Sequence, residues 1–278
     1  MPSKPIFALN HMAAPRLDCR AFIDLAASLG CAGVELRNDL ADKQLTDRAF
    51  FDGEPPEAIG AHARGRGLRL LGLSEAYGFN NWSDAMRAKV QLLIDQAKAS
   101  GAESISLIPR NDGIAMADTE RLGKLRGALG EILPMLEKVS MTALIEPLGF
   151  TTSSLRLKSE AIEAIDAVGG GARYKLVHDT FHHHLAGETQ FFPDRTGIVH
   201  ISGVADPTLA VADMQDGHRI LVDAHDRLGN VAQIRALLDA GYAGAFSYET
   251  FSPSVHALDD PETALRTSMD FISAALVG

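Results

Sequence analysis

Short apolar runs alternate with amphipathic segments along the chain. Each run holds four to six mostly aliphatic or small residues and is typical of a buried strand, whereas the segments between them carry apolar residues at helical spacing. The runs predict strands at 6–9, 32–36, 68–73, 104–108, 142–145, 174–177, 197–201 and 245–248. The spacing predicts helices at 20–29, 55–66, 83–100, 118–138, 155–168 (or from 158), around 186, 231–240 and 260–277.

This alternation predicts an α/β fold with a parallel sheet, and about eight repeats predict closure into a single (β/α)8 TIM barrel. The active site of such a barrel lies at the C-terminal ends of the strands. The 278 residues suffice for one barrel domain spanning 1–278, and no linker divides the chain. A doubly wound sheet would favour a Gly-x-Gly-x-x-Gly after the first strand, where the chain reads LNHMAAP.

The composition argues against several classes of function. The net charge is −10 without a basic block, so a nucleic-acid partner is not expected. The two cysteines, Cys19 and Cys31, form no disulfide framework or metal knuckle. The N-terminus lacks the apolar core of a signal peptide, and no window is apolar enough to span a membrane. We therefore expect a cytoplasmic protein with no membrane partner.

Ionisable side chains lie at the ends of four consecutive predicted strands. The stretch 174–185 reads YKLVHDTFHHHL, with Asp179 where the apolar run stops, and Glu146, His200 and Glu249 end the strands on either side of it in the chain. Because the carboxyl ends of barrel strands meet at one mouth, we expect these four side chains to converge.

Three carboxylates and one imidazole suit one divalent cation such as Mn²⁺, Mg²⁺, Co²⁺ or Zn²⁺. A single carboxylate at a strand end is most often a helix N-cap. Four charged strand ends at one rim would repel one another, and a cation removes that cost. The pattern therefore predicts a metal site, in which the second ring nitrogen of His200 needs an acceptor.

Other polar and aromatic residues give weaker signals. His182 lies one helical turn beyond Asp179 and suits a further ligand or a hydrogen-bond donor to substrate, while His183 and His184 fit a loop or helix surface. Glu35 and Arg37 are better explained as a structural ion pair than as substrate contacts. The segment 74–82 is predicted to be a loop, and its three aromatic residues would either cover the site or pack against the rim (Tyr77, Phe79 and Trp82).

Several of these motifs together resemble the xylose-isomerase-like TIM barrel superfamily, which includes sugar epimerases, inosose isomerases and dehydratases, and apurinic-site endonucleases. The resemblance rests on Glu146-Pro147, Asp179-Thr180-x-His182, His200, Arg219 and Tyr248-Glu249. The closing segment YETFSPSVHAL is most similar to the inosose isomerase branch.

The resemblance implies an isomerase or epimerase of a ketose or keto-inositol, and hence a small-molecule partner. Glu146, Asp179, His200 and Glu249 would hold one divalent metal ion, with Mn²⁺ favoured. Glu146 and Glu249 would be the catalytic pair, moving a proton through a metal-bound cis-enediolate. His182 and Arg219 would bind substrate oxygens. The family also implies a monomer or homodimer.

Other functions remain open from the sequence. A metal-dependent inosose dehydratase would share the first proton abstraction, a phosphodiesterase would resemble the endonucleases, and a barrel without catalysis would only bind sugar. Arg219 is followed by ILVDAHDRLGN where many relatives have Pro-Gly-x-Gly, which creates an Asp223-x-His225 pair like that of the endonuclease metal sites. We interpret this pair as a loop feature, because Ser74-Glu75 and Pro109-Arg110 offer no imidazole at the earlier strand ends.

Overall fold

Parallel strands close into a barrel surrounded by helices. The computed structural model describes residues 4–277, and their strands follow one another in chain order around the barrel, with β1 paired to β8. The strands are β1 Ile6–Asn10, β2 Gly33–Arg37, β3 Arg69–Tyr77, β4 Ser104–Ile108, β5 Thr142–Ile145, β6 Tyr174–Asp179, β7 Thr196–Ile201 and β8 Ala245–Tyr248. This architecture is the predicted (β/α)8 barrel.

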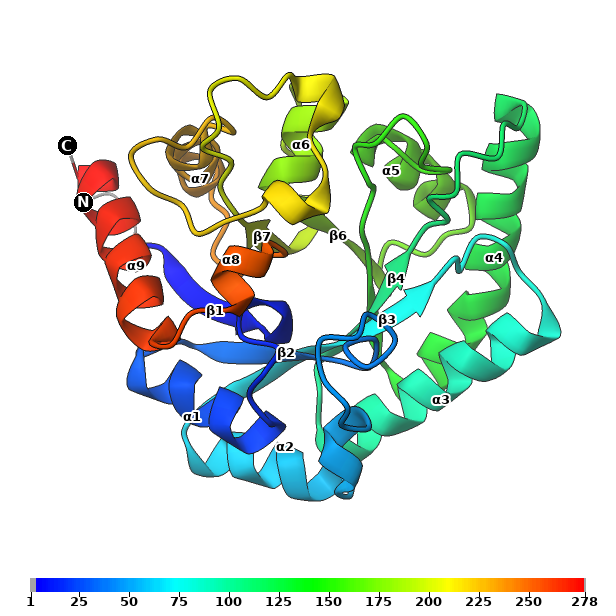
Figure 1. The fold of residues 1–278 in the computed structure, drawn as a ribbon. Coiled ribbons are helices and arrows are strands. Elements are labelled where there is room, and N and C mark those ends of the chain that lie inside the picture. The colour runs from blue at the N-terminus through cyan, green and yellow to red at the C-terminus, as the bar shows by residue number, and fades with distance from the viewer. Residues whose placement is uncertain (1–3, 278) are drawn as a thin grey trace.

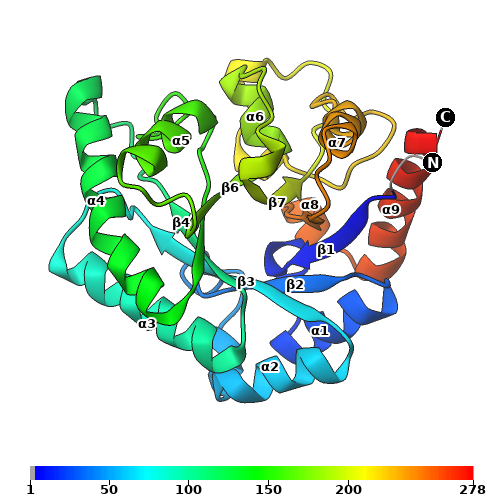
Figure 2. The ribbon, with the colours of Figure 1, turned by 180° about the vertical axis from the view of Figure 1, so that it is seen from behind.

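The helices lie outside the strands, as Figure 1 and the view from behind in Figure 2 both show. They are α1 Cys19–Ser28, α2 Pro56–Gly65, α3 Asp84–Ser100, α4 Asp118–Val139, α5 Lys158–Ala167, α6 Thr180–Ala186, α7 Asn230–Asp239, the short α8 Pro253–His256, and α9 Pro261–Val277. Gly60 on α2 allows close helix packing, because a Cβ there would lie 1.8 Å from the Ser100 carbonyl oxygen. Within residues 4–277, no helix has an apolar stretch long enough to cross a membrane.

Two local predictions need correction. The segment 74–82 is not all loop, since β3 continues to Tyr77 and pairs with β4 beyond an irregularity between Leu73 and Ala76. The predicted helix near 186 begins immediately after β6, at Thr180.

Alternation along each strand places the candidate ligands inside the barrel. Successive side chains of a strand point to opposite faces. Leu144, Val177 and Ile198 belong to one small apolar cluster within the barrel, separate from the large core between strands and helices. Two residues further along the same strands, on the same face, come Glu146, Asp179 and His200. The apolar layer is thus the floor beneath a polar layer at the carboxyl ends.

Candidate metal centre

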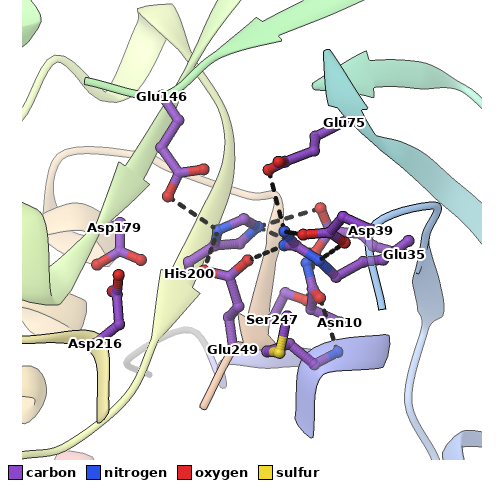
Figure 3. A network of polar contacts seen from close by, with 12 residues as sticks. Asn10, Glu35, Asp39, Glu75, Glu146, Asp179, His200, Asp216, Ser247 and Glu249 are labelled. Carbon is purple, nitrogen blue, oxygen red and sulfur yellow. Dashed lines mark hydrogen bonds and ion pairs between the residues drawn. The ribbon is translucent and has the colours of Figure 1, made fainter. Parts of the chain in front are cut away.

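Four buried side chains meet at the mouth of the barrel. Glu146 follows β5, Asp179 ends β6, His200 lies in β7 and Glu249 follows β8. Each offers one ligand-type atom, and these atoms all lie within 4.8 Å of one another. Figure 3 shows Glu146 and Glu249 approaching the His200 ring from different strands. The spacing is small enough for one cation to contact all four side chains.

His200 has one nitrogen held by the protein and one that is not. Its Nε2 lies 3.1 Å from Glu35 Oε2, and Glu35 also accepts a hydrogen bond of 2.6 Å from the Ser247 hydroxyl. Its Nδ1 is buried without a hydrogen-bond partner, 3.3 Å from Glu249 Oε2 and 3.6 Å from Glu146 Oε1. With Nε2 donating to Glu35, the Nδ1 lone pair points among carboxylates, which is the arrangement a metal ligand needs. The residues therefore fit a divalent cation.

The two glutamates have different electrostatic surroundings. Burial raises the pKa of Glu146, and the neighbouring Glu249 carboxylate raises it further. Burial acts against ionisation of Glu249 as well, but His200, Arg219 and Arg37 hold the pKa of Glu249 well below its usual range. A pair of carboxyl groups whose pKa values are pushed apart can divide proton acceptance and donation between them.

Arg37, at the end of β2, holds Glu249 in place. Its NH1 donates to Glu249 Oε1 at 2.6 Å, and it makes two hydrogen bonds of 2.8 Å to Asp39. It also lies 3.1 Å from Glu75, whose pKa burial raises to about 7 although Arg37 opposes the shift. The predicted ion pair between Glu35 and Arg37 is wrong, because Glu35 turns to His200 while Arg37 reaches Asp39, Glu75 and Glu249.

Arg219 joins two of the candidate ligands. It is 1% exposed, and its NH2 lies 2.5 Å from Asp179 Oδ2 and 3.0 Å from Glu249 Oε2. The Phe251 ring lies 4.5 Å from the guanidinium carbon. Arg219 therefore lies beside the metal-ligand candidates and lines the mouth cavity.

Asp179 also organises the helix that carries His182. Its Oδ1 accepts from the backbone nitrogens of Phe181 and His182 at 2.8 and 3.0 Å, which caps α6. Gly149 permits the segment after β5 to contact this helix, since a Cβ there would lie 2.2 Å from the His182 carbonyl oxygen. His182 is buried, and its Nδ1 has no partner. The mouth cavity, of about 110 Å³, is lined by both Arg219 and His182.

One of the remaining candidates lies at the mouth, and the others lie elsewhere. Phe79 is buried, Trp82 packs against the core, and Tyr77 lines the mouth cavity. Asp223 and His225 are exposed, and their contact is a turn in which the His225 nitrogen donates to Asp223 Oδ1. They are not part of the convergent group found in residues 4–277.

The sequence analysis misjudged the burial of one side chain and missed one contact between two others. His183 is half-buried rather than on the surface, with its Nδ1 2.9 Å from Lys158 Nζ. The contact between Glu35 and His200 was missed as well. The alternation of side chains along a strand could have indicated that Glu35 points into the barrel. Glu35 lies two residues before Arg37 and therefore on the same inward face of β2.

The fold is a parallel (β/α)8 barrel, and three carboxylates and one imidazole converge at its mouth to form a candidate metal centre. Residues 23–275 match the family described as xylose isomerase-like TIM barrel, and the chain belongs to this family. The family resemblance inferred from the strand-end motifs is thereby confirmed.

Curated relatives are distant. The inosose isomerase of Halalkalibacterium halodurans is 23% identical over 212 residues, which cover 73% of each protein. A ribose import ATP-binding protein of Rhizobium meliloti, RbsA 3, is 26% identical over 177 residues. That match covers 63% of this chain and 31% of the ATP-binding protein, so the match spans less than a third of that protein.

Solved structures match over nearly the whole chain. A xylose isomerase domain protein of Salmonella typhimurium superposes with a TM-score of 0.88 at 27% identity, covering 100% of this chain and 99% of that one. The IolI protein, solved with a bound zinc atom, has a TM-score of 0.84 at 18% identity, covering 99% and 98%. The second likeness shows the fold alone.

Proposed function

We propose that this chain is a divalent-metal-dependent isomerase or epimerase of a ketose or keto-inositol. The observation that carries the proposal is the convergence of Glu146, Asp179, His200 and Glu249, whose ligand-type atoms all lie within 4.8 Å of one another. Support comes from the family and from the inosose isomerase among its relatives. Manganese leads among the candidate metals, because three carboxylates and one imidazole favour a cation of intermediate hardness.

The site suits proton transfer next to a carbonyl group. When bound, a divalent cation would act as a Lewis acid toward the substrate carbonyl and so make the neighbouring C–H more acidic. Glu146 and Glu249 project from β5 and β8, which are not adjacent, so they can approach a bound substrate from two sides. One carboxylate removes the proton and the other returns it, with a cis-enediolate in between.

Neighbouring side chains hold the substrate and the catalytic pair. The Arg219 guanidinium binds substrate oxygens and stabilises the negative charge of the enediolate. His182 has a buried Nδ1 without a partner beside the mouth, which suits a hydrogen bond to a substrate hydroxyl. Arg37 does not need to touch substrate, since its bond to Glu249 Oε1 fixes that carboxylate in place.

Solvent exchange tests the proposal. The metal-loaded protein is incubated with ketoses and inososes in deuterium oxide, and carbon-bound deuterium is followed by NMR. Glu146→Gln keeps the shape of the side chain but removes the base, so exchange should fall by about a hundredfold or more. Exposed Asp223→Asn is the matched control and should retain full exchange.

Full exchange in Glu146→Gln would contradict the two-glutamate mechanism. Accumulation of an unsaturated diketone would instead identify the dehydratase reaction, which shares the first step. Nicking of abasic DNA without sugar exchange would point to the phosphodiesterase.

A further inference from the structure

A larger groove opens beside the mouth cavity and shares part of its lining. The mouth cavity has about 110 Å³, and the groove has about 490 Å³. Lys43, Glu75 and Tyr77 line both. The groove therefore continues from the candidate metal centre outward over the end of β3, between the segment after β2 and helix α3.

The mouth cavity by itself is small for a ligand site. Small-molecule sites usually measure roughly 300–1,000 Å³, so the mouth lies below this range and the groove lies within it. A substrate confined to the mouth would leave the adjoining groove to water. A substrate with a second part would use both, with its reacting end beside Glu146 and Glu249.

The charges of the groove argue against an anionic ligand. Asp39, Asp42 and Glu75 line it, against Lys43 and Lys89. Lys43 is 3.4 Å from Asp39, and Asp39 also binds Arg37, so the positive charges near the mouth already have partners. A phosphate or carboxylate group would meet more negative than positive charge. A neutral group with many hydroxyls would find both donors and acceptors.

Two exposed apolar side chains give the groove a surface for the carbon face of a ring. Tyr77 is 42% exposed and Leu92 is 58% exposed, and both line the groove. The Tyr77 hydroxyl accepts a hydrogen bond of 3.0 Å from the Asn111 nitrogen, which fixes the ring before any ligand arrives. A fixed aromatic ring among polar groups suits a molecule with one apolar face and a hydroxylated edge.

We infer that the groove binds a second sugar or polyol ring. The substrate is then a glycosylated ketose or keto-polyol, with its reacting carbonyl at the mouth and its second ring against Tyr77 and Leu92. This inference rests on the proposed function and adds the class of substrate to it.

Binding measurements test the groove separately from catalysis. Isothermal titration calorimetry on the purified protein compares D-fructose with turanose, maltulose and isomaltulose, which carry the same ketose with a glucosyl group on three different hydroxyls. At least one of these disaccharides should bind about tenfold more tightly than D-fructose, because an extra stacked and hydrogen-bonded ring adds affinity.

Substitutions in the groove should remove this gain. In Leu92→Asp, the dissociation constant of the disaccharide should rise to that of D-fructose, while D-fructose binding stays unchanged. In Tyr77→Ala, where the lost side chain lines both the groove and the mouth, the two dissociation constants should become equal. Ile114→Asp is the matched control, since Ile114 is also an exposed aliphatic residue but does not line the groove. It should leave every dissociation constant unchanged.

Three results would overturn the inference: equal binding of all four sugars, a gain that persists in both groove variants, or binding of no sugar at all. Failure of the proposed function gives a different result. In that case none of the sugars acquires carbon-bound deuterium with the metal-loaded protein, whatever its dissociation constant.

Discussion

His178 and Asp179 are neighbours on β6, yet they belong to two different polar clusters. Asp179 points into the barrel, where its ligand atom joins those of Glu146, His200 and Glu249. His178 points outward and meets Lys158 of α5 and Gln233 of α7. Both residues are buried. The comparison shows what separates a candidate metal site from a structural cluster of the same residue types.

The outer cluster supplies its own partners. Lys158 Nζ lies 2.9 Å from the Nδ1 atoms of both His178 and His183, and His178 Nε2 lies 2.9 Å from Gln233 Oε1. Burial lowers the pKa of Lys158 to about 8, while Glu188 opposes the shift. Every ring nitrogen of His178 therefore has a protein partner, and no ligand is needed.

The inner cluster lacks such a partner at one atom. His200 Nδ1 is buried, faces two carboxylates and has no hydrogen bond. Burial of ionisable groups is thus shared by both clusters and does not by itself indicate a metal. A metal is indicated where carboxylates converge on an imidazole nitrogen that has no hydrogen bond within the protein.

Replacing a histidine by leucine should have very different effects in the two clusters, and the largest effect is expected in the inner cluster. His200→Leu removes one ligand, so the bound metal should be lost and kcat/KM should fall about a thousandfold or more, because a Lewis acid contributes several kcal/mol to the barrier. Metal content and solvent exchange are measured together. Retention of metal and activity with an intact far-ultraviolet circular dichroism spectrum would rule out His200 as a ligand.

His178→Leu should break the outer cluster without touching the metal. The Lys158 ammonium loses an acceptor and Gln233 loses a partner, so the free energy of unfolding should fall by about 2–4 kcal/mol. Urea unfolding measures this change. Loss of metal in His178→Leu at a pH and temperature where it is folded would show that the two clusters are not independent.

Glu35→Gln should weaken the metal site more gently. Glu35 accepts from His200 Nε2 and so sets which ring nitrogen is free to bind metal. Loss of such a partner typically lowers metal affinity by about 10- to 100-fold. Competition with a chelator measures the affinity, and exposed Glu163→Gln is the control. Equal affinity in the two variants would show that Glu35 has no role in metal binding.

The smallest effect is a pH dependence confined to the outer cluster. Because burial lowers the pKa of Lys158 to about 8, the unfolded state binds more protons than the folded state above that pH. Stability from this group should therefore rise between pH 8 and the unfolded value near 10.5, by about 2 kcal/mol.

The measurement is the difference in the free energy of unfolding between the metal-free wild type and Lys158→Met, at pH 7.5 and at pH 10. Groups common to both proteins cancel in this difference, which should move in favour of the wild type as the pH rises. No change, or a change of opposite sign, would mean that Lys158 does not titrate in this range.

The barrel follows directly from the alternation of apolar runs and amphipathic segments. The four strand-end ligand candidates could also be predicted from the sequence, because parallel strands bring distant residues to one rim. The strand β3 was harder, since Ser74 and Glu75 are polar and yet lie inside the strand. A polar pair at a barrel mouth resembles a loop in sequence.

Contacts across the barrel could not be predicted. Glu35 and His200 are 165 residues apart, and their contact depends on barrel closure and on the inward face of two strands that are not neighbours. The contact of Lys158 with His183 depends on how α5 packs against α6, which helical periodicity does not determine. Periodicity places residues on faces, and packing decides which faces meet.

The most direct test is the metal content of the purified, untagged protein by mass spectrometry. We expect about one divalent ion per chain, bound by the four side chains at the mouth. No bound ion after reconstitution would contradict it, and a value near three would contradict a single centre and favour a phosphodiesterase site.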